Sequence, residues 1–262
     1  MGQPAAAAQT NPQTDVRPGS QAIANGPQPG RDPRMAEAHG LLDDHLVMEA
    51  LRLFEDIIDE DPENFEALWA AARSAVAQGL LSRGRRVQND WYRIAESYAR
   101  RATEIEPDDL EGLYWLLSAK GLRAAQTGAR DASTLGGEVY DLAHQVLETD
   151  SLHAGAYHAL GKLNFLVRRL SFFERFVARN FLGADVMSST SWEDAERYLE
   201  RAVELRPEYI LFRLDLGRMY LQRERMEEAR SQFHRVLELP LLEPPDWRFQ
   251  EIAERHLAES FN

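Results

Sequence analysis

Four helix-ending signals divide the chain at comparable intervals. Apolar residues spaced by three and four run up to Asp61-Pro62, Glu106-Pro107, Asp150-Ser151 and Arg206-Pro207. Proline disrupts a helix interior, so these stops mark helix ends. Small or apolar residues recur 12, 8 and 5 positions before each stop, a spacing that places them on one helix face. They are Ala50, Phe54, Ile57, Ala95, Ala99, Ala102, Val139, Ala143, Val146, Ala195, Leu199 and Ala202.

The last copy of this unit is the clearest. It has Leu216-Gly217, then Tyr220, Ala229, Phe233 and Val236, and 34 residues separate Pro207 from the equivalent Leu241. This pattern and period resemble the tetratricopeptide repeat (TPR). Each such repeat is a pair of helices, here called the first and the second helix. The first helix of an earlier pair fits the pattern as well, with Tyr157, Leu160-Gly161 and Phe165. We therefore predict an all-α, TPR-like right-handed helical solenoid of about four repeats, with a C-terminal capping helix over 246–261 and Asp246 as its N-cap.

The spacing of the stops predicts where the repeats depart from the standard unit. The intervals are 45, 44, 56 and 34 residues, so three exceed the TPR period. The additions fall around 79–89, 121–137 and 162–191, as longer connections or extended helices. Additions of this kind lie on one face of a solenoid, often the binding face. The run 35–60 is expected to be one continuous helix that supplies only the second half of the first pair.

Residues 1–34 differ in composition from the rest. They contain six of the 12 prolines and no aromatic residue, which predicts a disordered Pro/Gln/Ala-rich tail ahead of a helical domain over 35–262. No charged and apolar leader precedes Ala5–Gln9, so a cytoplasmic location is expected, with an exported chain that has lost its leader as the alternative. No apolar run approaches the 18 residues of a membrane span.

Composition excludes several kinds of chemistry. The formal net charge is −13, which argues against nucleic-acid partners, and there is no cysteine for a disulfide, a thiolate metal site or a thiol nucleophile. His153 and His158 are five apart, and no HExxH motif, phosphate loop or Gly-x-Ser-x-Gly elbow occurs. The sequence predicts no catalytic residues, no metal and no cofactor, and hence no enzyme.

The segment with the most distinctive sequence lies between Phe172 and Tyr209 and reads FFERFVARNFLGADVMSSTSWEDAERYLERAVELRPEY. With Leu216-Gly217-Arg218 and the Leu-Pro ending at 239–240, it resembles the regulator of microtubule dynamics family, clearly over 165–262 and more weakly over 40–164. Arg218 stands where the family has Lys, Leu182-Gly183 where it has Phe-Gly, and Ala184-Asp185-Val186 where it often has prolines. The resemblance implies an all-α TPR domain that acts by binding. Because this chain and tubulin are both acidic, electrostatic attraction between them is not expected.

Three groups of residues are candidates for a binding site. The first alternates cations with phenylalanines and is suited to an anionic lipid head group or a carboxylate-bearing peptide, unless these residues fill a core and pair with acids. It comprises Arg168, Arg169, Phe172, Phe173, Arg175, Phe176 and Arg179. The second, Arg83, Arg85 and Arg86 followed by Trp91 and Tyr92, is a binding cluster or a solvated loop. The third, Trp69, Tyr114, Trp115 and Tyr157 on first helices, either lines the groove or packs between repeats.

These features lead to two functional hypotheses. The first is a non-catalytic scaffold that binds a protein or peptide partner in its concave groove. The alternative is a carrier of a hydrophobic small molecule, such as a fatty acid or phospholipid, in a pocket closed by the insertions. An enclosed cavity lined by Trp115, Tyr157 and the segment 172–181 would favour the carrier, and an open groove with Arg-rich walls would favour the peptide.

Overall fold

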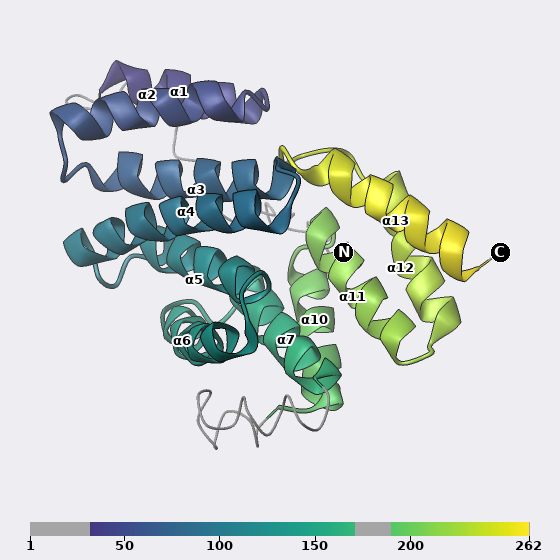
Figure 1. Ribbon diagram of the computed structural model, residues 1–262. Helices are drawn as coiled ribbons and strands as arrows, with labels where there is room; N and C mark the ends of the chain where they lie inside the picture. The colour runs from purple at the N-terminus through teal and green to yellow at the C-terminus, as the bar shows by residue number, and fades with distance from the viewer. Residues whose placement is uncertain (1–31, 171–189, 262) are drawn as a thin grey trace, which may run out of the picture.

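The computed structural model describes residues 32–170 and 190–261, which form eleven α-helices and no strand (Figure 1). The helices are α1 (Pro33–Asp43), α2 (Val47–Glu60), α3 (Phe65–Leu81), α4 (Arg85–Ile105), α5 (Leu110–Ala124), α6 (Ala129–Thr149), α7 (Ala154–Arg169), α10 (Trp192–Leu205), α11 (Ile210–Gln222), α12 (Met226–Glu238) and α13 (Asp246–Ser260). Each first helix packs against a second helix, in the pairs α1 with α2, α3 with α4, α5 with α6, α7 with α10 and α11 with α12. The predicted all-α repeat solenoid is confirmed.

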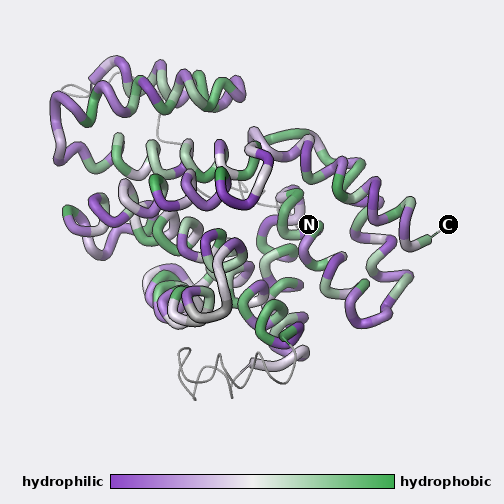
Figure 2. The backbone as a smooth tube through the Cα atoms, viewed as in Figure 1, coloured by the Kyte–Doolittle hydropathy of each residue, from purple (hydrophilic) through white to green (hydrophobic). Residues whose placement is uncertain are grey.

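The repeat register found in the sequence forms the interior of the stack. All twelve register residues are at most 3% exposed. Figure 2 shows the same alternation, with hydrophobic positions recurring along the helices and hydrophilic positions between them. Burial of one face on every helix is what holds successive pairs together.

The two Leu-Gly steps place glycine where paired helices approach each other closely. A Cβ at Gly161 on α7 would lie 2.7 Å from Cγ of Leu199 on α10, and one at Gly217 on α11 would lie 2.7 Å from Cε1 of Phe233 on α12. Neither position has room for a side chain. Glycine is therefore required at these steps by packing between helices.

The expectation of one continuous helix over 35–60 is wrong. The chain breaks after Asp43, and His45 has a positive φ of 64°, which a helix cannot accommodate. The apolar spacing continues across the break because both α1 and α2 bury their apolar faces in the same core. The first pair is therefore complete.

The first two insertions extend helices. The helices α4 and α6 each have 21 residues, and α3 has 17, so the additions around 79–89 and 121–137 lie largely within helices. The third addition includes residues 171–189, which lie outside the described residues.

The C-terminal end of the stack returns to α3. Arg248 on α13 donates hydrogen bonds of 2.6 Å to the carbonyl oxygens of both Leu80 and Ser82. Glu243, just before α13, forms an ion pair of 3.1 Å with Arg73 on α3. The C-terminal end of the solenoid is thus joined to the second helix pair by contacts between residues far apart in the chain.

The expected N-cap of the last helix needs correction. The helix α13 begins at Asp246 itself, with Pro245 at the N-cap position. The Asp246 carboxylate accepts hydrogen bonds from the backbone N–H groups of Leu242 and Glu243. It therefore fixes the turn that precedes α13. In the described ranges, no helix is long and apolar enough to cross a bilayer.

Candidate functional site

A cleft of about 500 Å³ lies between α7, α11 and α13. Its lining mixes cationic and apolar side chains: Lys162, Phe165, Leu166, Arg169, Arg218, Leu221, Gln222, Glu224 and His256. Volumes of this size are typical of ligand pockets. We take this cleft as the candidate functional site.

The repeat pattern positions the two central cations. Lys162 directly follows Leu160-Gly161, and Arg218 directly follows Leu216-Gly217, so they occupy equivalent positions on successive first helices. In each helix the glycine faces the paired second helix. The next residue is rotated by about 100° and faces the cleft.

Both cations are held by one buried carboxylate. Asp215, which is 1% exposed, lies 2.5 Å through Oδ1 from Nζ of Lys162 and 3.3 Å from Nη1 of Arg218. Its Oδ2 lies 3.0 Å from Nε2 of His158, which donates because a carboxylate only accepts. Burial alone would raise the pKa of Asp215, but the charge of Lys162, the hydrogen bond from His158 and the charge of Arg218 hold it well below its ordinary value. Asp215 is thus a fixed anion that orients the cations.

Positive charge is crowded around Lys162. Burial lowers the pKa of Lys162, Asp215 opposes this, and the guanidinium groups of Arg218 and Arg169 lower it further. Arg169 is exposed, and its Cζ lies 5.3 Å from the ring centroid of Phe165. A bound anion would relieve the repulsion among the three cations.

His256 closes one side of the cleft from α13. Its Nε2 accepts a hydrogen bond of 3.3 Å from Nε of Arg218, and its ring stacks on Phe233 at 5.0 Å. Burial and the charge of Arg218 lower the pKa of His256. His256 and Asp215 thus contact different nitrogens of the Arg218 guanidinium, Nε and Nη1 respectively.

Apolar surface lies one helical turn beyond the cations. Phe165 and Leu166 follow Lys162 by three and four residues, and Leu221 follows Arg218 by three, so they share the cleft-facing side of their helices. A ligand that carries an anionic group next to an apolar group matches both parts of this lining.

The first predicted group is only partly described. Arg169 lines the cleft, and its guanidinium lies over the ring of Phe165, which was not among the phenylalanines predicted for this group. Arg168 is half-buried in the last turn of α7 and is not part of the lining. The other members, Phe172, Phe173, Arg175, Phe176 and Arg179, lie outside the described residues.

The groove aromatics are largely internal. Trp69, Tyr114 and Trp115 are 4%, 8% and 6% exposed. Tyr114 packs against α7 so closely that a Cβ at Gly155 would lie 2.2 Å from its ring. Tyr157 is half-buried and donates to the carbonyl oxygen of Ser151. None of the four lines the cleft, and their positions favour packing between repeats.

Sequence reasoning missed Lys162, Asp215, Arg218 and His256 as site residues. A signal for the two cations was present, because each follows a Leu-Gly step in a successive first helix. No local pattern indicated Asp215 or His256, which reach the site through the packing of α11 and α13. Within 32–170 and 190–261, no group of three or more His, Asp or Glu side chains is placed to hold a metal ion.

Comparison with known proteins places this fold in a family. The model of the family described as regulator of microtubule dynamics protein 1-3 matches residues 35–260. Regulator of microtubule dynamics protein 1 of Caenorhabditis elegans is 23% identical over 152 residues. That match covers 58% of this chain and 66% of the worm protein, slightly less than two thirds of its length.

Solved structures show the same architecture. A thermophilic TPR protein of Thermus thermophilus superposes with a TM-score of 0.59 at 20% identity, covering 86% of this chain and 97% of that one. MamA of Desulfovibrio magneticus gives a TM-score of 0.45 at 16% identity, covering 79% and 96%. The similarity to the Thermus protein supports the TPR fold.

Proposed function

We propose that this chain, which belongs to the regulator of microtubule dynamics protein 1-3 family, is a non-catalytic scaffold. Its TPR-like fold suggests a protein-interaction scaffold. In this proposal it binds a peptide segment of a partner protein in the cleft between α7, α11 and α13. The segment carries a carboxylate beside an apolar side chain. The carboxylate meets Lys162, Arg169 and Arg218, and the apolar side chain packs on Phe165, Leu166 and Leu221. The cytoplasmic location expected from the sequence stays a prediction.

One observation carries this proposal. Lys162 and Arg218 come from equivalent positions on successive repeats and are both tethered to Asp215, next to an apolar wall. Orientation by Asp215 lowers the entropy that the cations lose when a ligand binds. The remaining N–H groups of both side chains can serve an incoming anion.

The lining favours a peptide over a hydrophobic small molecule. Three basic side chains surround the cleft, whereas its apolar part consists of three side chains. A fatty acid or phospholipid needs a long apolar channel for its chain. Trp115 and Tyr157, whose presence in the lining of an enclosed cavity would have favoured the carrier, are not part of this cleft.

A peptide series with one altered group tests the proposal. The probe is a fluorescein-labelled dodecapeptide with alternating Glu and Leu, compared by fluorescence anisotropy with versions in which Gln or Lys replaces Glu. We expect the Glu peptide to bind and the others to bind at least about ten-fold more weakly, since each loses its charge-assisted contacts. The variant Arg169→Glu should weaken the Glu peptide similarly, because Arg169 is exposed and can be reversed without disturbing the core.

The matched control is Arg52→Glu, an equally exposed charge reversal on α2, far from the cleft along the stack. It should leave peptide binding unchanged. Equal binding of the Glu and Gln peptides, or equal loss in both variants, would remove the cleft as the site. An amphiphile that remains bound in native mass spectrometry and is released by Arg169→Glu would instead support the carrier.

A further inference from the structure

The outer face of α4 carries a second cationic surface that does not contribute to the cleft. Arg86 and Arg93 are exposed and seven residues apart, and Arg100 continues the series. Val87 and Ile94, also seven apart, are 47% and 38% exposed. Arg83 and Arg85 lie just before them, in and after the turn that joins α3 to α4.

These arginines are not neutralised by the rest of the described molecule. Among the described residues, Arg83, Arg85, Arg86 and Arg93 form no ion pair. Arg85 donates to the carbonyl oxygen of Gln126, and Asp90 is the one acid within residues 83–94. Four unpaired cations on a chain of net charge −13 are a local exception, and they attract acidic partners.

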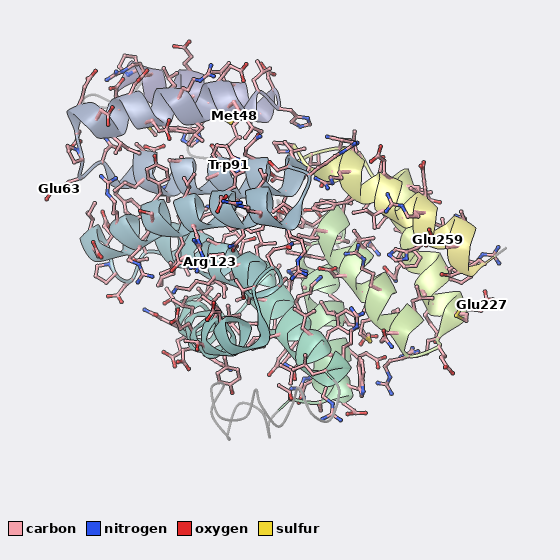
Figure 3. All side chains as sticks on the ribbon, in the orientation of Figure 1. Met48, Glu63, Trp91, Arg123, Glu227 and Glu259 are labelled. Atoms are coloured by element: carbon pink, nitrogen blue, oxygen red, sulfur yellow. The ribbon has the colours of Figure 1, made fainter. Side chains whose placement is uncertain are left out.

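The neighbouring elements limit where a partner can lie. Toward α2, the α4 surface is already in contact, because Tyr98 donates to Glu55 at 2.8 Å and Arg101 donates to the carbonyl oxygen of Pro62. Trp91 (Figure 3) is half-buried against the core, and Tyr92 is 1% exposed. What remains open is a strip with Arg86 and Arg93 on one side and Val87 and Ile94 on the other, which we call the α4 strip.

The seven-residue spacing indicates the shape of the partner. Side chains repeated every seven residues stay on one side of a helix and meet a second helix along its length. A partner helix alongside α4 would keep the same cationic and apolar positions in register over successive turns. Arg86 with Arg93 and Val87 with Ile94 are two such repeats side by side.

We propose that the α4 strip docks an amphipathic α-helix of another protein, with acidic residues seven apart facing Arg86 and Arg93 and apolar residues packing on Val87 and Ile94. This contact is separate from the peptide cleft and does not depend on it. The acidic side chains supply the charge complementarity, and the apolar stripe covers two side chains that are otherwise in water.

A designed helix tests this surface directly. The probe is a labelled 21-residue helix with Glu at every seventh position and Leu at alternating spacings of three and four, titrated against the full chain at low salt. The double reversal Arg86→Glu with Arg93→Glu is expected to weaken binding by about ten-fold or more. A probe with Lys in place of Glu should bind this variant better than it binds the unaltered protein. The double variant Val87→Ser with Ile94→Ser should also weaken binding, and the size of this loss should depend little on the salt concentration.

Four results can overturn the proposal. The control variant Arg197→Glu with Arg230→Glu reverses two exposed arginines on α10 and α12 and should bind the probe normally. Equal weakening in this control, or equal binding of a probe with the same composition in scrambled order, would contradict the α4 strip. Binding to vesicles of phosphatidylserine and phosphatidylcholine, with no binding of the designed helix, would assign the surface to a membrane instead. Self-association that is abolished by the Arg86 and Arg93 reversal would contradict a separate partner.

Discussion

Nζ of Lys162 lies 2.5 Å from Oδ1 of Asp215, a carboxylate that is 1% exposed. The two residues belong to successive first helices, so this ion pair connects neighbouring repeats beside the candidate cleft, which Lys162 lines. Asp215 also contacts His158 and Arg218, which means that one carboxylate organises three basic side chains.

Removing this carboxylate should strongly destabilise the fold. Asp215→Ala leaves Lys162 and His158 without their partner, and breaking a buried pair costs about 3–5 kcal/mol. Urea unfolding followed by circular dichroism measures this change. The double variant Lys162→Met with Asp215→Leu removes both charges and is expected to recover much of the loss. A loss below about 1 kcal/mol in Asp215→Ala would show that the pair contributes little.

The free energy of unfolding should depend on pH because Asp246 has a raised pKa in the folded protein. Burial raises its pKa to about 6, Glu243 raises it as well, and the two backbone hydrogen bonds and His45 oppose this. Because the folded pKa exceeds the unfolded value near 3.9, the stabilisation by protonated Asp246 is complete below pH 4 and is lost as the pH rises through 6. The free energy of unfolding of the unaltered protein should therefore fall relative to that of Asp246→Asn between pH 4 and pH 7.

The expected relative fall is about 2–3 kcal/mol, from the linkage between pKa and stability. Urea titrations of both proteins at half-unit pH intervals measure it. Asp215 acts in the opposite sense, because its lowered pKa gives stability that is lost only below about pH 4. A difference between the two proteins that stays constant from pH 4 to pH 7 would contradict the assignment to Asp246.

A methyl group at Gly161 should disrupt the pairing of α7 with α10. The added Cβ would lie 2.9 Å from the backbone nitrogen of Leu199 as well as 2.7 Å from its Cγ, so backbone must move. Overpacking of this kind costs about 1–3 kcal/mol. Thermal unfolding should show a lower Tm for Gly161→Ala.

Gly40 provides the matched control for this substitution. It lies within α1, and a Cβ there would meet nothing within 4 Å. Gly40→Ala should therefore stabilise the protein by up to about 1 kcal/mol through helix propensity. Equal effects of the two substitutions would mean that close approach to Leu199 is unimportant.

Loss of Arg248 should release the contact between α13 and the end of α3. Arg248→Ala removes two hydrogen bonds of 2.6 Å to the carbonyl oxygens of Leu80 and Ser82. Hydrogen bonds from a charged donor contribute about 1.5–3 kcal/mol each, less where they are solvated. Hydrogen–deuterium exchange should increase in α13 and at the end of α3. The neighbouring Trp247, which is 43% exposed, gives the control Trp247→Ala, for which exchange in α3 should not change.

The parts of this fold that sequence predicted are those that repeat locally. Ala95, Ala99 and Ala102 could be placed on a buried face because their spacing matches the turn of a helix, and each is fully buried. The break at His45 could not be found this way, because α1 and α2 bury their apolar residues in one core and the spacing runs on through the turn. The same limit affected the cleft: Arg169 was predicted from its neighbours, whereas His256 was not.

The sequence by itself determined the all-helical repeat and its buried register, because these follow from periodicity along one chain segment. Only the tertiary structure decided that Lys162 and Arg218 share Asp215, that His256 closes the cleft and that Arg248 reaches the end of α3. The physical reason is that these contacts depend on the rotation accumulated from pair to pair. That rotation is set by how side chains of neighbouring repeats pack, and no local spacing in the sequence encodes it.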